Sequence, residues 1–277
     1  MTIMSIQSFV SLGYVGNRAA TFVLETLGFK VASIPTVIYS NHSGYGKFEG
    51  RVLQAEEILS IFNGIMRITT NNDFKGVITG YIGNKHQPKL INQMINRLLL
   101  SNPNCIYVCD PAIANERGLF VDKNIASSVF DYLIPISDII TPNQVELEFI
   151  TGIKINNIDD AIKACEKLFS IGAKHVIATS IDLEDGYLKT VAFDGKDSFM
   201  IEVPRLSGPN NGAGDVFNAI ICAHIINGKS FKSSVHLAVS VLYRIINLSM
   251  GSKDILLVEG KKEIVNLQTY GQLNKIN

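Results

Sequence analysis

The sequence lacks the features that mark several large classes of protein. Tryptophan is absent, and the four cysteines form no Cys-x-x-Cys pair. Their spacing suits neither a disulfide-stapled secreted module nor a zinc site, so we expect buried free thiols. No apolar run approaches the ~20 residues that a membrane helix needs, and the first ten residues do not resemble a signal peptide. These absences predict a cytoplasmic protein with no membrane partner.

An excess of charge of either sign is also missing. Lys plus Arg and Asp plus Glu both number 25, which makes the formal net charge zero. No net positive field exists to attract nucleic acid, so we expect small-molecule ligands. The 47% of hydrophobic and 18% of charged residues are typical of a globular protein. Since no linker or internal repeat interrupts the chain, we predict one domain spanning 1–277.

What the sequence contains is an alternation of short buried strands with amphipathic helices. Strands are predicted at 3–6, 30–38, 76–79, 106–109, 138–140 and 175–179. Helices are predicted at 18–27, 89–100, 124–133 and 158–169, and near the C-terminus at 213–226 and 231–250. A tight turn at Asp194-Gly195 predicts an antiparallel hairpin of 187–193 and 198–203. The expected fold is a three-layer α/β fold, with a mostly parallel sheet covered by helices on both faces.

Two local features of this pattern allow more specific predictions. Asn17 is expected to cap the helix at 18–27. Apolar residues recur at helical spacing from Ile58 to Ile68, so we expect all of them to face the core.

A glycine-rich segment, Asn211 to Asp215, precedes an apolar helix. Backbone amides of Gly212, Ala213 and Gly214 would converge where the helix dipole is positive, a geometry that suits a phosphate. Asp215 could then accept a proton from an alcohol that attacks phosphorus. The alternative is an ordinary glycine turn with an aspartate cap.

A second candidate is the pair Asn143 and Glu146, three residues apart at the start of a short helix. Such a pair lies on one helix face and could hold a hydrated Mg²⁺ beside nucleotide phosphates. The same spacing is that of a capping box, and the two interpretations are compatible.

Asn-x-x-Glu followed by Gly-Ala-Gly-Asp resembles the motif pair of the ribokinase-like superfamily. Three N-terminal segments, 5–8, 13–20 and 40–46, resemble successive signatures of the pyridoxal kinase family, and the resemblance continues at 79–81, 108–111 and 137–143. It implies a ribokinase-like fold and ATP-dependent phosphorylation of the 5′-hydroxyl of pyridoxal, pyridoxine and pyridoxamine, a step of vitamin B6 salvage. It further implies Mg²⁺, a monovalent cation such as K⁺, and a homodimer.

The resemblance also implies roles for individual residues. Asp215 would be the catalytic base, with Gly212, Ala213 and Gly214 as the anion hole. The substrate-binding positions, besides Asp215, would be Ser8, Ser43, Gly44 and Tyr81, and Ser43 replaces the usual threonine. The nucleotide-binding positions would be Asp110, Asn143, Glu146, Thr179, Ser180, Asn211, Gly212 and Gly214. The metal would lie at Asp110 and Glu146.

One stretch departs from the family pattern. Asp110-Pro111 continues with Ala112, Ile113 and Ala114, without the usual glycine, which bears on the loop conformation and its nucleotide contacts. This departure leaves open a non-catalytic pyridoxal-binding protein. A kinase of the same superfamily acting on hydroxymethylpyrimidine or a sugar also stays open, because Asn-x-x-Glu and Gly-Ala-Gly-Asp do not distinguish acceptors. His42 could contact the substrate ring or only stabilise its loop. A dinucleotide-binding or P-loop protein is rejected, because neither glycine motif occurs.

Overall fold

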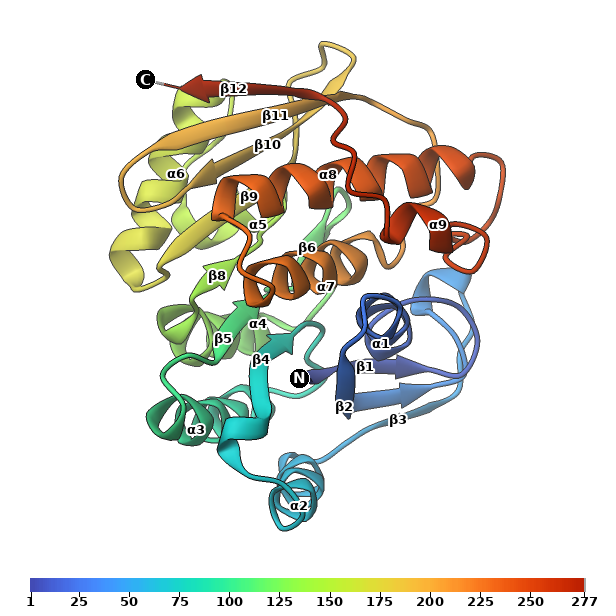
Figure 1. The fold of residues 1–277 in the computed structure, drawn as a ribbon, viewed down its shortest axis with the longest axis vertical. Helices are drawn as coiled ribbons and strands as arrows, with labels where there is room; N and C mark the ends of the chain where they lie inside the picture. Colours follow the sequence, from blue (N-terminus) through green and yellow to red (C-terminus); the bar gives the residue numbers. More distant parts are fainter. Residues whose placement is uncertain (277) are drawn as a thin grey trace.

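Ten strands form one continuous sheet in the computed structural model, which describes residues 1–276 (Figure 1). In chain order they are β1 (Thr2–Val10), β2 (Lys30–Tyr39), β3 (Gly50–Val52), β4 (Phe74–Thr79), β5 (Ile106–Cys109), β8 (Ile139–Ile140), β9 (His175–Asp182), β10 (Tyr187–Phe193), β11 (Ser198–Pro204) and β12 (Gln272–Ile276). Their spatial order is β12-β11-β10-β9-β8-β5-β4-β1-β2-β3. Two further short strands, β6 (Ala114–Asn115) and β7 (Gly118–Leu119), pair as a separate hairpin.

The centre of the sheet is parallel and both edges are antiparallel. The six strands from β2 through β1, β4, β5 and β8 to β9 all pair in parallel. Strands β10, β11 and β12 add an antiparallel extension, and β3 adds an antiparallel strand at the other edge. The mostly parallel sheet and its hairpin toward the C-terminal part are therefore confirmed.

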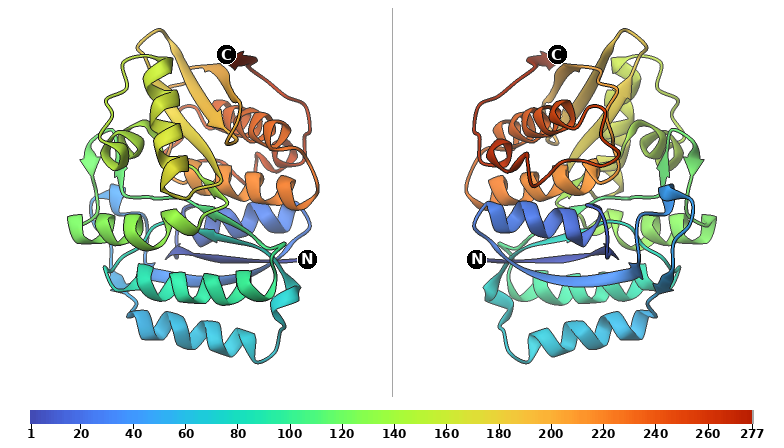
Figure 2. Two further views of the ribbon diagram at one scale, coloured as in Figure 1. Left: turned by 90° about the vertical axis from the view of Figure 1, so that its left-hand side faces the viewer. Right: turned by 90° about the vertical axis from the view of Figure 1, so that its right-hand side faces the viewer.

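The helices lie on both faces of this sheet. They are α1 (Asn17–Thr26), α2 (Ala55–Met66), α3 (Gln87–Ser101), α4 (Lys123–Tyr132), α5 (Gln144–Thr151), α6 (Ile158–Ile171), α7 (Ala213–Ile226), α8 (Phe231–Leu248) and α9 (Lys261–Ile264), with short 3₁₀ turns η1 (Ser43–Tyr45), η2 (Asn71–Asp73) and η3 (Ile134–Ile136). Helices α2 and α3 cover one side of β1 and β2, and α1 and α7 cover the other (Figure 2). Within residues 1–276, no helix is long and apolar enough to cross a membrane.

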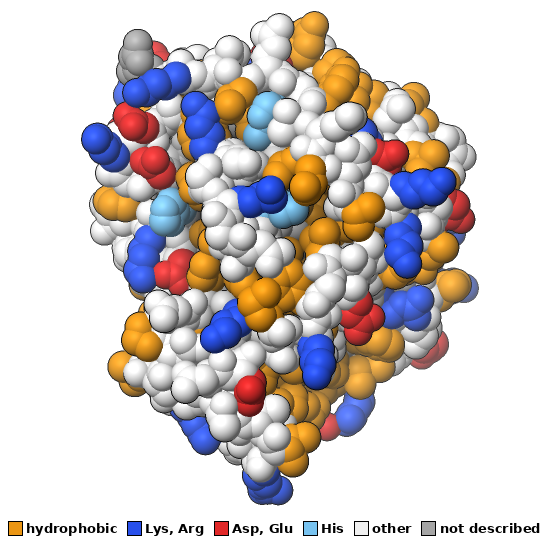
Figure 3. All heavy atoms as spheres, in the orientation of Figure 1, with side chains coloured by type: hydrophobic (Ala, Val, Ile, Leu, Met, Phe, Trp, Pro, Cys, Tyr) orange, Lys and Arg blue, Asp and Glu red, His pale blue; other side chains and the backbone are white. Residues whose placement is uncertain are grey.

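Two apolar cores result from this layering. Alternate residues of β1 point to opposite faces, so Met4 and Ile6 join the core under α2 and α3, while Ile3 joins the core under α1 and α7. The four cysteines are free and buried, as expected. On the face seen in Figure 3, basic and acidic side chains are interspersed.

Helix α7 is the element that matters most for the site. It lies between the sheet and α8, and every residue from Val216 to His224 is buried. A helix enclosed on nearly all sides has a fixed axis, so the residues of its first turn are held rigidly.

Several local predictions were wrong. Asn17 does not cap α1: Gly16 precedes the helix, and the Asn17 amide instead donates to the carbonyls of Gln7 and Ile34. Ile61 and Ile68 do not face the core: they are 37% and 86% exposed, and Ile68 lies beyond α2, which ends two residues earlier at Met66. The edge strands β3 and β12 were not predicted, since most of their side chains are exposed and carry no apolar alternation.

Candidate active site

The predicted site residues gather at the carboxyl ends of the parallel strands. Tyr81 follows β4, Asp110 follows β5 and Asn143 follows β8. Because neighbouring parallel strands end at the same edge of a sheet, these segments lie side by side, where ligands of open α/β sheets usually bind. The first turn of α7 reaches the same edge, as its contacts with Asp110 show.

Asp215 lies in that first turn, partly buried. Its carboxylate accepts a hydrogen bond of 2.7 Å from the amide of Gly16, a residue 199 positions away in sequence. Burial raises the pKa of Asp215 to about 6, and the Gly16 amide opposes the rise because it favours the charged form. Nothing in the sequence pattern singled out Gly16 for this role.

The glycines before Asp215 are required by close packing. Gly212 has a φ of 86°, and a Cβ atom there would lie 2.0 Å from the Tyr14 carbonyl oxygen. A Cβ atom on Gly214 would lie 3.0 Å from Oδ2 of Asp110. Within residues 1–276, backbone hydrogen bonds engage the amide of Ala213, at 3.0 Å from the Asn210 carbonyl, but not those of Gly212 and Gly214. The amides of Gly212 and Gly214 therefore remain available, and Gly214 lies beside Asp110.

Asp110 is the centre of a group of three carboxylates. Its Oδ1 accepts from the Ala112 amide at 3.1 Å and its Oδ2 from Nδ2 of Asn218 at 3.0 Å. Burial, together with the negative charges of Glu146 and Asp215, raises the pKa of Asp110 well above its usual range. Asn218 is only 1% exposed and lies one turn after Asp215 on α7. No sequence motif pointed to this residue.

Asn143 and Glu146 form the capping box that was one of the two interpretations. Asn143 Oδ1 accepts from the Glu146 amide at 3.0 Å, and Glu146 Oε2 accepts from the Asn143 amide at 3.0 Å. The other carboxylate oxygen, Oε1, accepts from the amides of Ile113 and Ala114 at 2.8 and 3.1 Å. Burial raises the pKa of Glu146 to about 7, against the effect of these three amides.

This pair also explains how the chain accommodates its departure from the family pattern. Nδ2 of Asn143 donates to the Ala114 carbonyl at 2.8 Å, so both the N–H and the C=O of Ala114 are held by this pair. Ala114, at the position of the missing glycine, begins strand β6 and has no positive φ; the left-handed residue is Ala112, at 44°. The loop therefore forms without the glycine.

The three carboxylates fit a hydrated magnesium ion better than a tightly ligated metal. Within residues 1–276, no cluster of three or more His, Cys, Asp or Glu side chains has the arrangement of a metal site. Magnesium needs only one or two carboxylates and keeps several waters. Each oxygen of Asp110 accepts one hydrogen bond, which leaves lone pairs free, and the repulsion that raises its pKa would be relieved by a cation.

Ser8, on β1, and Tyr81, just after β4, come from neighbouring strands of the sheet. Ser8 is 9% exposed, and its side chain lies against Gly16, where a Cβ atom would come within 2.2 Å of Ser8 Oγ. The Tyr81 ring stacks on Phe120, which follows β7, with centroids 6.2 Å apart. Burial raises the pKa of Tyr81, so the phenol stays neutral and can hydrogen-bond a ligand.

Ser43 and Gly44 lie in the exposed turn η1. The Gly44 amide donates to Nδ1 of His42 at 3.1 Å, so His42 stabilises its own loop. A Cβ atom on Gly44 would lie 3.8 Å from Nδ2 of Asn211, which places this loop beside the glycine segment.

Thr179 and Ser180 lie near the end of the parallel part of the sheet. Thr179 pairs with Asn143 in an isolated bridge, and its amide donates to the Pro142 carbonyl at 2.8 Å. Ser180 is exposed and has a φ of 55°. Both are therefore close to the Asn143 and Glu146 pair.

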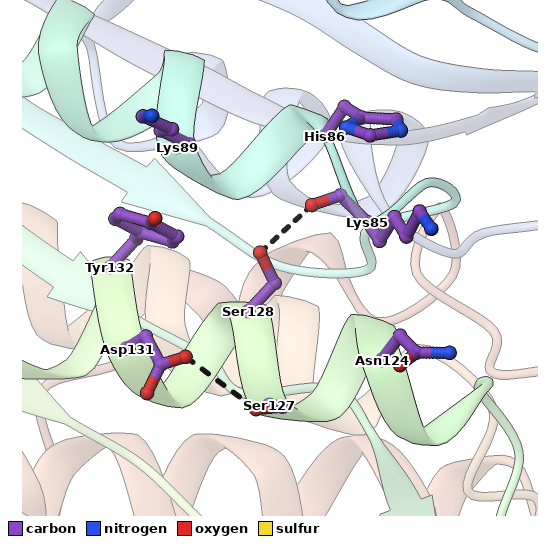
Figure 4. Close-up of a pocket in the computed structure, with 8 residues that line it drawn as sticks. All are labelled: Lys85, His86, Lys89, Asn124, Ser127, Ser128, Asp131 and Tyr132. Carbon is purple, nitrogen blue, oxygen red and sulfur yellow. Dashed lines mark hydrogen bonds between the residues drawn. The ribbon is translucent and has the colours of Figure 1, made fainter.

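A separate pocket of about 280 Å³ opens between the start of α3 and helix α4 (Figure 4). Lys85, Lys89 and Tyr132 are among the side chains that line it, and Ser128 Oγ donates to the Lys85 carbonyl at 2.8 Å. It contains none of the predicted site residues.

Comparisons with known proteins agree with this geometry. The model of the family described as phosphomethylpyrimidine kinase matches residues 29–257. A pyridoxal kinase of Rubrobacter xylanophilus is 32% identical over 272 residues, which covers 96% of this chain and 94% of that protein. The crystal structure of a pyridoxal kinase from Entamoeba histolytica has a TM-score of 0.94 at 26% identity and covers 99% of both chains. The structure of Plasmodium falciparum PdxK with the ligands AMP-PNP and PL has a TM-score of 0.91 at 27% identity and covers 100% of this chain and 99% of that one.

Proposed function

The chain belongs to the pyridoxal kinase family, and we propose that Asp215 is the base of its reaction. The chain catalyses ATP-dependent phosphorylation of pyridoxal, a step of vitamin B6 salvage. Pyridoxine and pyridoxamine are proposed as further acceptors.

The observation that carries the assignment is the environment of Asp215. Its carboxylate is fixed by the Gly16 amide at the start of a buried helix, and its pKa of about 6 leaves it ionised at neutral pH yet basic enough to take a proton. As the 5′-oxygen of the vitamin attacks the γ-phosphorus of ATP, Asp215 takes the hydroxyl proton, and the bond to the ADP oxygen breaks.

The anion hole is proposed at the first turn of α7. The amides of Gly212 and Gly214 have no protein acceptor within the described residues and lie at the positive end of the helix. Ala213, whose amide bonds Asn210, contributes the bend that presents its two neighbours. These amides stabilise negative charge on the transferring phosphoryl group.

Mg²⁺ would be held by Asp110 directly and by Glu146 through water, because the Glu146 oxygens already bind three amides. When bound, the ion neutralises charge on the nucleotide phosphates. Asn143, Thr179, Ser180 and Asn211 are proposed to line the nucleotide side of the site. A monovalent cation such as K⁺ belongs to the same proposal.

The vitamin is proposed to bind between Tyr81 and Ser8, under the loop that carries Ser43 and Gly44. The stack of Tyr81 on Phe120 offers an aromatic surface for a pyridine ring. Ser8 lies against Gly16 and so next to the base. A homodimer and a cytoplasmic location complete the proposal.

Product formation tests the acceptor. Purified protein with ATP and Mg²⁺ should form ADP and pyridoxal phosphate in equal amounts when pyridoxal is added. The family model is named for a pyrimidine kinase, so hydroxymethylpyrimidine belongs in the same panel, with ribose. Faster turnover of either compound than of pyridoxal would change the assigned substrate but leave the mechanism as proposed. Vitamin binding without ADP formation would favour a non-catalytic binder.

A further inference from the structure

Three segments far apart in the sequence meet at Tyr45, beside the proposed substrate loop. The Tyr45 hydroxyl donates to Oδ1 of Asp254, 209 positions away. Nζ of Lys253 lies 3.8 Å from the centroid of the Tyr45 ring. A Cβ atom on Gly13 would lie 3.7 Å from the same hydroxyl. The ring of Tyr45 is thus enclosed by the turn after β1 on one side and by the segment after α8 on the other.

The residues just before Tyr45 lie beside the glycine segment that precedes Asp215. Gly44 lies beside Asn211. The hydrogen bond from the Gly44 amide to Nδ1 of His42 fixes the turn from His42 to Gly44. The His42 ring lies edge-on to the Tyr45 ring, with centroids 6.5 Å apart, so the side chains at the two ends of the turn also pack together. Any movement of Tyr45 therefore moves Ser43 and Gly44 relative to Asp215.

The other hydrogen bonds of residues 42–46 stay within the loop: Nδ2 of Asn41 donates to the carbonyls of His42 and Lys47 at 3.1 and 2.9 Å, which closes its base. Ser43, Gly44 and Gly46 are all exposed, and a segment with so little buried surface opens easily. A hydrogen bond from a phenol to a carboxylate is charge-assisted, so it is stronger than a bond between neutral groups. Burial, together with the hydrogen bond to Asp254 and the charge of that carboxylate, raises the pKa of Tyr45 to about 12, so the phenol is protonated and donates at neutral pH.

We propose that the Tyr45–Asp254 hydrogen bond is a positioning contact that holds the loop 42–45 closed over the substrate site. It rests on the proposed function, because the loop is taken to bind the vitamin. Tyr45 touches no reacting atom in this account, so the contact sets the KM for pyridoxal and leaves the phosphoryl-transfer step itself unchanged.

The test is a double-mutant cycle of Tyr45→Phe and Asp254→Ala, with kcat and KM measured for pyridoxal and for ATP. Tyr45→Phe should raise the KM for pyridoxal about tenfold, the order expected for one charge-assisted bond. Both kcat and the KM for ATP should stay within about twofold. If the two groups act only through their hydrogen bond, the KM for pyridoxal of the double variant should be no higher than that of Tyr45→Phe. The matched control is Tyr187→Phe, a tyrosine with Lys189 near its ring, 5.9 Å from the centroid, on strand β10.

Amide hydrogen exchange of the free protein provides a readout that does not depend on activity. Both single variants should exchange faster at 43–46 than the wild type, and Tyr187→Phe should not. Each of three results would overturn the proposal: unchanged exchange at 43–46, effects on the KM for pyridoxal that add in the double variant, or a fall in kcat at constant KM. Failure of the wild type to phosphorylate pyridoxal would instead refute the proposed substrate, while the exchange result would still decide whether the contact holds the loop.

Discussion

Replacing Gly16 by alanine should disturb the base without touching its side chain. Gly16 has a φ of 56°, and a Cβ atom there would lie 2.2 Å from both the carbonyl oxygen and Oγ of Ser8. The left-handed backbone costs a non-glycine residue about 1–2 kcal/mol, and relieving such a contact costs about 1–3 kcal/mol more. We therefore expect the free energy of unfolding to fall by about 2–5 kcal/mol.

The same change should alter the ionisation of Asp215. Relief of the contact requires Gly16 to move, which weakens the 2.7 Å bond from its amide to the Asp215 carboxylate. A bond to a charged group contributes about 1.5–3 kcal/mol, and each 1.36 kcal/mol corresponds to one pH unit. Because this bond favours the charged carboxylate, its loss raises the pKa of Asp215 above the present value of about 6.

The assay is the pH dependence of kcat/KM for pyridoxal, with Gly28→Ala as the control. Gly28 follows the other end of α1, has a φ of 88°, and has no atom within 4 Å of an added Cβ. Gly28→Ala therefore measures the free-energy cost of a positive φ at alanine without any steric contact. The acid limb of the profile should move upward by roughly one pH unit or more in Gly16→Ala and stay in place in Gly28→Ala. Identical profiles for the two variants would refute the role given to the Gly16 amide.

Three further predictions concern the carboxylates. In the wild-type protein, kcat/KM should rise as the pH increases through about 6, the pKa of Asp215, because only the ionised carboxylate can take a proton; a profile flat from pH 5 to 7 would contradict this. Asn218→Ala removes the 3.0 Å hydrogen bond to Asp110 and should lower turnover at limiting Mg²⁺ by about tenfold. A titration of ADP formation with Mg²⁺ measures this, and an unchanged Mg²⁺ dependence would contradict the role given to Asn218. Burial raises the pKa of Glu146 from 4.5 to about 7, so its neutral form contributes stability that is complete below about pH 4.5 and is lost as the pH rises through about 7. The free energy of unfolding in urea should therefore be lower at pH 7.5 than at pH 5. This difference should be smaller in Glu146→Gln.

Local patterns in the sequence predicted much of the fold. The parallel strands and the helices were found because each has its own apolar periodicity, and the segment 211–215 was found because its glycines and aspartate are contiguous. The capping box of Asn143 and Glu146 is likewise contained within four residues. The roles assigned to these residues in catalysis and binding stay predictions, as does the single domain over 1–277.

The contacts that organise the site could not be predicted in the same way. Gly16 reaches Asp215, Asn218 reaches Asp110 and Tyr45 reaches Asp254 only after the sheet has brought distant segments together. Such pairs have no fixed spacing in a sequence, so a single chain carries no signal for them.

The central claim is that Asp215 takes the proton of the vitamin hydroxyl, and Asp215→Asn tests it most directly. Asparagine keeps the size of the side chain and an oxygen for the Gly16 amide, but it cannot act as a base at neutral pH. The measurement is the rate of pyridoxal phosphate formation by the variant, alongside its affinity for ATP. We expect ATP binding to be nearly unchanged and turnover to fall by about 10²-fold or more. Near-normal turnover would contradict the account.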